Sequence, residues 1–253
     1  MNFTQIYEQF SALEDPGFWQ QSYTNFYRAW FEGNRWQQYL EGLGTTVLVT
    51  ILALCIGVVL GIVVAVLRTG HDQQRKGRHN PVLAVLNLIC KIYVTVIRGT
   101  PMMVQLLIMG FVVFKSSRNF TLVGALSLGI NSGAYVAEII RGGLMSLDPG
   151  QMEAGRSLGL GYLDTMRYIV VPQAFKAILP ALGNEFITLL KDTSLISVVA
   201  GKEIVYFAQA IVSRTYEAMW PYLITAAMYL VLVLIFTWLQ GKLERRLRAS
   251  DRR

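Results

Sequence analysis

Three polar residues in one apolar stretch are the first feature that could do chemistry. Glu185, Thr188 and Asp192 interrupt the apolar run 177–200 at positions i, i+3 and i+7. In a helix this spacing places all three side chains on one face. An ionisable residue within a membrane costs roughly 2.5–3.5 kcal/mol on insertion scales, so it usually faces protein or water. The face indicates either a polar path that receives the ammonium of a solute, or hydrogen bonds and ion pairs that hold a bundle together.

Polar residues in two other apolar stretches could join this face. Gln105 follows Arg98-Gly99-Thr100-Pro101, and Asn131 lies seven residues before Glu138. We expect Gln105 and Asn131 to line the same path as Glu185, with interhelical hydrogen bonding as the alternative. Arg141 lies one turn beyond Glu138, so these two residues are expected to form a structural ion pair near one end of their helix.

Catalytic constellations are missing from the sequence. It has no Gly-x4-Gly-Lys-[Ser/Thr], His-Glu-x-x-His or Gly-x-Ser-x-Gly motif, and its histidines, His71 and His79, lie in a basic loop. Cys55 and Cys90 lie in apolar stretches, where small buried hydrophobes are expected. We therefore expect no catalytic residue, no metal site and no cofactor on this chain, which points away from an enzyme.

Composition indicates an integral membrane protein. Of 253 residues, 53% are hydrophobic and only 15% are charged, against about 25% charged in an ordinary soluble domain. Basic residues cluster in loops beside apolar spans and form no face typical of nucleic-acid binding. The expected fold class is therefore all-α, integral to the membrane.

Five membrane-spanning helices fit the apolar stretches. The stretch from Pro81 to Phe114 is ambiguous, because its 34 residues are interrupted by Lys91 and by Arg98–Pro101. One crossing there gives a total of five, and two crossings would give six. We expect spans at about 43–67, 92–114, 120–140, 177–200 and 219–239.

Loop charges choose between these topologies. With one crossing, the segments 68–81, 141–176 and 242–253 share a side and hold fourteen Lys and Arg, while the opposite segments hold six. Positive loops favour the cytoplasm. This predicts five spans, an N-terminus outside, a cytoplasmic loop at 141–176 and a basic cytoplasmic tail at 241–253.

The segment 1–42 holds 12 of the 29 aromatic residues. It is expected on the extracytoplasmic side. It could lie as a helix in the membrane interface, or pack against the outer ends of the spans.

The loop 141–176 is expected to contain a short helix over about 150–158. Asp148 is a plausible N-cap and Pro149 fits the first helical position. Gln151 could complete a capping box with Asp148. Gly159 and Gly161 are expected to end the helix.

This loop resembles a known signature. Glu153-Ala154-Gly155-Arg156-Ser157-Leu158-Gly159, with Ile169-Val170-Val171-Pro172 after it, is similar to the Glu-Ala-Ala loop of the membrane permease subunits of ABC importers. The Glu-to-Gly and Gly-to-Ile distances match, while Gly155 replaces an Ala and Val171 a Leu. The stretches 98–106 and 183–195 resemble the polar-amino-acid branch of that family, of histidine, glutamine and arginine type.

The resemblance implies an ATP-driven amino-acid importer in the plasma (inner) membrane of a prokaryote. This chain would form the translocation path, and a cytoplasmic ABC ATPase dimer would hold ATP and Mg²⁺. Other implied partners are a second permease subunit (a copy or a paralogue), an extracytoplasmic amino-acid-binding protein, the amino-acid substrate and membrane lipid. The residues implied in contact with the ATPase are Glu153, Ala154, Gly155, Arg156, Gly159, Ile169 and Pro172.

An ion-coupled secondary transporter or channel is the alternative. Glu138, Glu185 and Asp192 would then be ion sites. Such transporters often show internal repeats and paired broken helices, which five spans without a visible repeat fit poorly.

Overall fold

The structure is a computed structural model that describes residues 2–74 and 80–250. The described residues are mostly helical and contain no strand. Arg75, Lys76, Arg78 and His79 of the expected basic loop lie outside the described residues, as do residues 251–253. In chain order the helices are α1 (Phe3–Ser11), α2 (Phe18–Trp30), η1 (Glu32–Asn34), α3 (Arg35–Asp72), α4 (Pro81–Gly99), α5 (Met102–Ile108), η2 (Met109–Val113), α6 (Phe120–Met145), α7 (Gly150–Ser157), α8 (Tyr162–Thr165), η3 (Met166–Val170), α9 (Val171–Asp192), η4 (Thr193–Val199), α10 (Ile204–Thr215) and α11 (Met219–Ser250).

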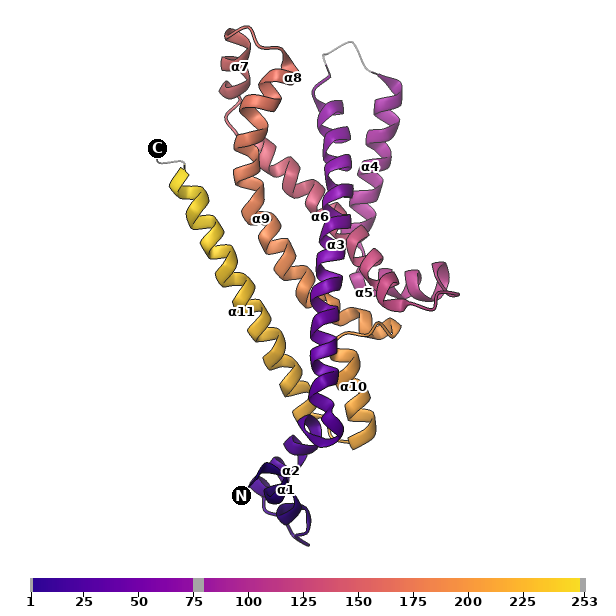
Figure 1. Cartoon of the computed structure of the whole chain (residues 1–253). Helices are drawn as coiled ribbons and strands as arrows, with labels where there is room; N and C mark the ends of the chain where they lie inside the picture. The colour runs from indigo at the N-terminus through magenta and orange to yellow at the C-terminus, as the bar shows by residue number, and fades with distance from the viewer. Residues whose placement is uncertain (1, 75–79, 251–253) are drawn as a thin grey trace.

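Within residues 2–74 and 80–250, four helices are long and apolar enough to cross a membrane: α3, α4, α6 and α11. A fifth crossing is present if the segments Tyr162–Val199 and Ile204–Thr215, which meet at a 45° bend, count as one span. The chain is therefore an all-α, multi-pass membrane protein. Figure 1 shows α7 and α8 at one end of the bundle and α1 and α2 at the other.

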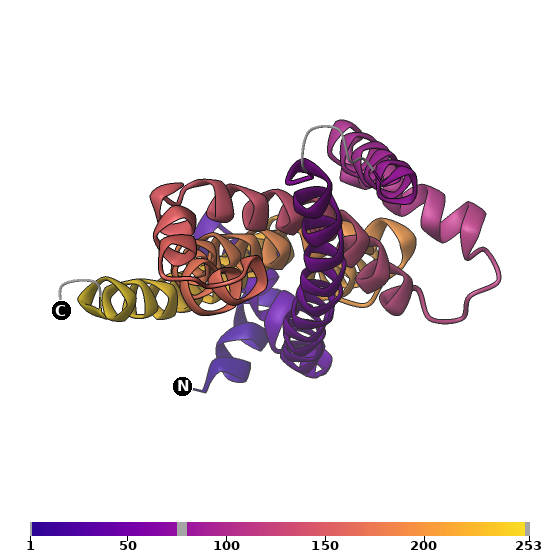
Figure 2. The same ribbon diagram turned by 90° about the horizontal axis from the view of Figure 1, so that it is seen from above.

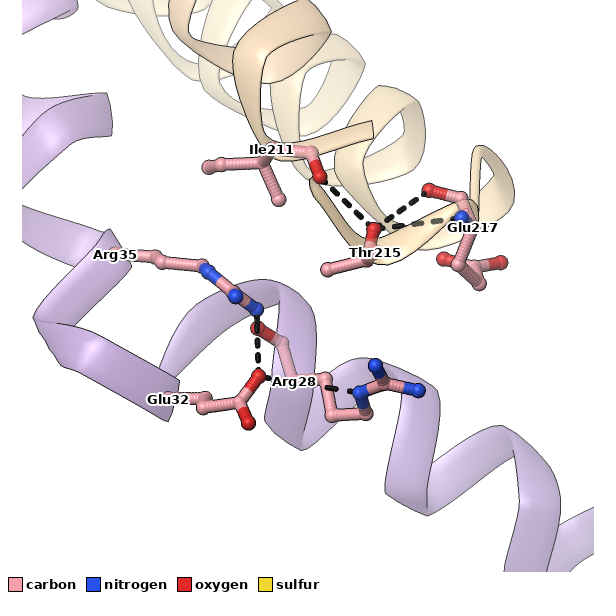
Figure 3. Close-up of polar contacts among 6 residues, drawn as sticks. All are labelled: Arg28, Glu32, Arg35, Ile211, Thr215 and Glu217. Atoms are coloured by element: carbon pink, nitrogen blue, oxygen red, sulfur yellow. Dashed lines mark hydrogen bonds and ion pairs between the residues drawn. The ribbon is translucent and has the colours of Figure 1, made fainter. Parts of the chain in front are cut away.

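The first long helix extends beyond the span expected at about 43–67. α3 begins at Arg35, so the N-terminal segment ends at Asn34. Gly33 and Asn34 have φ of 61° and 56°, a left-handed turn that Gly and Asn tolerate best. Glu32 fixes the turn by pairing with Arg35 at 2.8 Å and with Arg28 at 3.9 Å (Figure 3).

The second expected span, about 92–114, is interrupted in the structure. Residues 92–114 are not one helix, because α4 ends at Gly99 and a separate pair, α5 and η2, follows. Pro101 restricts the preceding residue to extended angles, and Thr100 has φ −118° and ψ 146°. At the other end, Asn80 accepts a hydrogen bond from Val82 N at 3.0 Å, with Pro81 in the first turn. The apolar helix long enough to cross is therefore Pro81–Gly99.

Small residues let α3 and α6 pack closely along their lengths. A Cβ at Gly57 would lie 2.7 Å from Ser132 Oγ, and one at Gly61 would lie 2.7 Å from Val136 Cβ. On α6, a Cβ at Gly129 would lie 2.7 Å from Ile56 Cβ. Two glycines four residues apart are typical of helices that approach closely in membranes. This contact forms the centre of the bundle, whereas α4 and α11 lie at opposite edges (Figure 2).

The N-terminal segment packs onto the ends of the spans. Tyr7 stacks on Tyr27 with ring centroids 4.3 Å apart, which joins α1 to α2. Phe26 contacts Trp220 edge-on at 5.2 Å, which joins α2 to the start of α11. Of the two arrangements expected for this segment, packing against the span ends is therefore present.

Candidate functional site

The loop after α6 contains the short helix that the sequence predicts. α7 covers Gly150–Ser157, and Asp148 Oδ1 accepts a hydrogen bond from Gly150 N at 2.8 Å. Gly159 N donates to Arg156 O at 2.9 Å and Leu160 N donates to Gly155 O at 3.1 Å. These two bonds and the φ of 81° at Gly159 make a Schellman end. Gly159 thus ends α7 as expected.

Gly155 faces inward. It is buried, and a Cβ there would lie 2.8 Å from Thr165 Oγ1 on α8. The missing side chain therefore serves the close packing of α7 on α8. Ala is the residue of the family signature at this position, and here Thr165 leaves no room for it.

Two hydrogen bonds tie α7 and α8 to the long helices. Gln173 Nε2 on α9 donates to Gln151 Oε1 on α7 at 2.9 Å and to Ile169 O at 3.0 Å. Gln151 is therefore engaged with α9 and does not complete the expected capping box. Tyr162 OH on α8 donates to Gln73 Oε1 just beyond α3. Sequence reasoning missed Gln173 and Gln73, because only the fold brings them to the loop.

The remaining loop residues lie as follows. Glu153, Ala154 and Arg156 on α7 are exposed. Ile169 is half-buried in η3, a π-helical turn. Pro172 lies in the first turn of α9. Proline has no backbone N–H to donate, and the π-helical turn η3 before it accommodates this.

Gln105 and Asn131 are hydrogen-bonded to each other, and Gln105 also bonds to the backbone. Asn131 Nδ2 donates to Gln105 Oε1 at 3.0 Å. Gln105 Nε2 donates hydrogen bonds to Ile97 O at 2.7 Å and to Thr100 Oγ1 at 2.8 Å, both at the break between α4 and α5. The geometry matches the structural alternative for Gln105, which holds α4, α5 and α6 together at the proline break.

Glu185 takes a separate partner on α6. Ser132 Oγ, which is buried, donates to Glu185 Oε1 at 2.7 Å. Thr188 is exposed and donates to Asn184 O in its own helix at 3.1 Å. Asp192 is half-buried at the last position of α9. Because Ser132 directly follows Asn131, the Glu185 pair and the Gln105 pair lie at one level of α6.

Glu138 is the centre of a larger ion cluster than expected. Its pairing with Arg141, at 3.1 Å, was expected. Arg68 of α3 also pairs with it, and Arg98 Nη1 of α4 lies 3.8 Å from Glu138 Oε2. The Arg98 guanidinium also lies 5.2 Å from the centroid of the Tyr135 ring. One carboxylate thus joins three helices.

A buried carboxylate that sequence reasoning did not single out lies at the bend before α10. Glu203 is fully buried. Its Oε1 accepts from Tyr206 N at 2.9 Å, which caps α10, and its Oε2 accepts from Tyr229 OH of α11 at 2.7 Å. An acidic residue directly before an apolar helix was the available signal, since such a residue is often an N-cap.

Relatives with assigned functions cover most of the chain. The arginine transport system permease protein ArtQ of Bacillus subtilis is 36% identical over 217 residues, which cover 84% of this chain and 93% of ArtQ. The glutamine transport system permease protein GlnP of Escherichia coli K12 is 32% identical over 213 residues, with 83% and 92% covered.

Solved structures share the fold. An amino acid ABC transporter crystallised with histidines aligns with TM-score 0.74 and 42% identity, covering 83% of this chain and 94% of that one. The MetNI methionine ABC transporter aligns with TM-score 0.71 at 18% identity, which shows the fold alone. Residues 82–249, which include the α7 loop and the Ser132–Glu185 pair, match the family described as binding-protein-dependent transport system inner membrane components. The chain belongs to this family of transport-system membrane components.

Proposed function

We propose that this chain is the permease subunit of an ATP-driven, binding-protein-dependent amino-acid importer. The arginine and glutamine permeases among its relatives support an amino acid as the substrate. The observation that carries the proposal is the hydrogen bond between Gln151 on α7 and Gln173 on α9. It connects an exposed helix at one end of the bundle to the helix that bears Glu185.

The mechanism follows from that connection. A separate ATPase contacts the exposed side of α7 through Glu153, Ala154 and Arg156, and closes when it binds ATP. Gly155, Gly159, Ile169 and Pro172 keep the loop rigid, since they set its packing, its end and its return to α9. Movement of α7 is then transmitted to α9 through Gln173, which changes the packing of α9 against α6 at Ser132.

The same proposal assigns the two ends of the bundle. The end with α7 is cytoplasmic, which places the C-terminus inside and the N-terminal segment outside. The positive loops on the α7 side support this orientation. The complex contains two permease subunits, an ATPase dimer that holds ATP and Mg²⁺, and an extracytoplasmic binding protein, in the inner membrane of a prokaryote.

In this proposal Glu185 lines the substrate path. A carboxylate held by Ser132 can meet the ammonium of an amino acid as a charge-assisted hydrogen bond. Asn131 on α6, with Thr188 and Asp192 on α9, extends the polar surface, and Gln105 on α5 holds Asn131 in place through its hydrogen bond. The Glu138 cluster lies on the side of α6 toward α4 and is assigned a structural role.

Reconstitution tests the proposal. The chain with its partner subunits in liposomes is expected to take up arginine, glutamine or another polar amino acid only with ATP. Uptake should persist when an ionophore removes ion gradients and stop when ATP is depleted. The opposite pattern would favour an ion-coupled transporter. Both Glu153→Lys and Gly159→Val are expected to insert normally. Glu153→Lys should lose the ATPase and with it ATP-driven uptake, whereas Gly159→Val should uncouple ATP hydrolysis from uptake.

A further inference from the structure

Arg98, in the last turn of α4, has more hydrogen-bond donors than the described residues use. Its one ion pair there is a loose one, with 3.8 Å between Nη1 and Glu138 Oε2. No hydrogen bond from its side chain is present among the residues that the structure describes. The side chain is 42% exposed, so a planar guanidinium with free donors is open to a ligand.

Glu138 does not need the charge of Arg98. Arg68 of α3 and Arg141 of α6 both donate hydrogen bonds to its carboxylate, Arg141 Nη2 at 3.1 Å. Three guanidinium groups therefore face one carboxylate. Asp72 also acts on Arg141, but its side chain is 56% exposed. Positive charge is left over, and Arg98 carries the most exposed part of it.

Arg98 and Glu185 are held at neighbouring positions on α6. The Arg98 guanidinium lies 5.2 Å from the centroid of the Tyr135 ring, and Glu185 accepts the hydrogen bond of Ser132. Ser132 and Tyr135 are three residues apart, so they lie on adjacent turns of the same side of the helix. Tyr135 is 38% exposed. A cation and an anion therefore lie beside one accessible part of α6.

The backbone that carries Arg98 is fixed by Gln105. Its Nε2 donates to Ile97 O and to Thr100 Oγ1, on either side of Arg98, and its Oε1 accepts from Asn131 of α6. The end of α4 is thereby tied to the helix that bears Tyr135. A charged group held in place in this way loses less freedom when it binds a ligand.

We propose that Arg98 binds the carboxylate of the amino-acid substrate, while Glu185 meets its ammonium. This inference rests on the proposed function. A guanidinium matches a carboxylate through two parallel hydrogen bonds. An α-amino acid carries its ammonium and its carboxylate on a single carbon, so a cation and an anion at neighbouring positions fit it. Arg98 then makes the permease select amino acids over amines that lack a carboxylate.

Lys191 is the competing cation. It is exposed on α9 beside Asp192, and no ion pair in the described part of the chain includes it. A test of Arg98 therefore includes Lys191→Gln. Arg167→Gln is a matched control, because Arg167 also lies over a tyrosine ring, 5.6 Å from the centroid of Tyr168, but in the loop that contains α7 and α8.

The experiment compares each amino acid with its amide. Isothermal titration measures binding of arginine and glutamine, and of argininamide and glutaminamide, to the chain purified with its permease and ATPase partners. The binding protein is left out, because it recognises the substrate itself. The intact complex should prefer the amino acid to its amide. Arg98→Gln should weaken binding of the amino acid roughly 10- to 100-fold, as for a lost charge-assisted hydrogen bond, and leave binding of the amide unchanged.

The other variants separate charge from structure. Arg98→Lys, which keeps the charge without the planar fork, should retain part of the preference. Arg167→Gln and Lys191→Gln should retain all of it. Unchanged amide binding shows that the Arg98→Gln complex is folded, which a merely structural role of Arg98 would not predict.

Two results would overturn this inference and leave the proposed function standing. One is an intact complex that binds amino acid and amide equally, and the other is a preference that survives in Arg98→Gln or disappears in Lys191→Gln instead. An intact complex that neither binds an amino acid nor takes one up in liposomes would overturn the proposed function together with the inference.

Discussion

Ser132 of α6 donates a hydrogen bond to Glu185 of α9, with 2.7 Å between Oγ and Oε1, beside Gly57 of α3. Three long helices therefore meet at one hydroxyl group. The carboxylate of Glu185 is held by a buried donor, and only a residue without a side chain at position 57 leaves space for that donor.

The charge of Glu185 is expected to matter more than its hydrogen bond. Glu185→Gln keeps the volume and can still pair with Ser132, but it cannot attract an ammonium. Because hydrogen bonds to charged groups contribute about 1.5–3 kcal/mol, uptake should fall roughly 10- to 100-fold. Ser132→Ala leaves the carboxylate of Glu185 in place, so it should lower uptake less than Glu185→Gln does. Uptake assays in liposomes at equal amounts of complex measure both, and unchanged uptake by Glu185→Gln would leave Glu185 a structural role only.

The glycine contact between α3 and α6 is expected to set stability. Gly61→Val places its Cβ against Val136, and overpacking of this kind costs about 1–3 kcal/mol. Gly44→Val on the same helix meets nothing nearby and should cost far less. Thermal unfolding of the purified chain in detergent compares the two variants. Equal unfolding temperatures would mean that the helices separate easily at Gly61.

The packing of α7 on α8 predicts a compensating pair. Gly155→Ala introduces a Cβ that collides with Thr165, so it should shift α7 and weaken retention of the ATPase. Thr165→Ala removes the colliding atoms, and the double variant should recover much of the retention. Pull-down of the ATPase with each variant measures this. A double variant no better than Gly155→Ala alone would exclude this contact as the cause.

Gln173 is expected to transmit movement without contributing to ATPase binding. Gln173→Ala removes the bond to Gln151, so the ATPase should be retained while uptake per ATP hydrolysed falls severalfold. Gln209→Ala, an exposed glutamine on α10, is the control. The ratio of uptake to phosphate release in liposomes gives the result. A normal ratio in Gln173→Ala would show that movement passes through other contacts.

Local signals in the sequence predicted the helices well, and contacts between distant segments poorly. Asp148, Pro149 and Gly159 predicted the position of α7, because capping depends on a few neighbouring residues. Pro101 marked a break, yet the helix of spanning length was placed too late, because the apolar sequence continues on both sides of the proline. The glycine pairs Gly57–Gly61 and Gly129–Gly133 carried a readable signal for close helix packing.

Partners of the polar residues could not be read from spacing. Gln105 was expected in a path and instead lies within reach of backbone acceptors at the α4–α5 break, and Glu138 has two arginines from other helices beside Arg141. Helical spacing places a side chain on a face, but which helix lies opposite depends on the fold. The pairing of Ser132 with Glu185 and of Gln151 with Gln173 also depends on which helices the fold brings together.

The most direct test of a motor-coupled permease is whether α7 holds an ATPase. The tagged chain is extracted in mild detergent and its stoichiometric partners are identified by mass spectrometry, beside Glu153→Lys and the control Glu8→Lys, which reverses an exposed charge on α1. An ABC ATPase retained by the intact chain and by Glu8→Lys, but lost with Glu153→Lys, is the predicted result. A chain that purifies without an ATPase and still moves amino acids in liposomes would contradict the account.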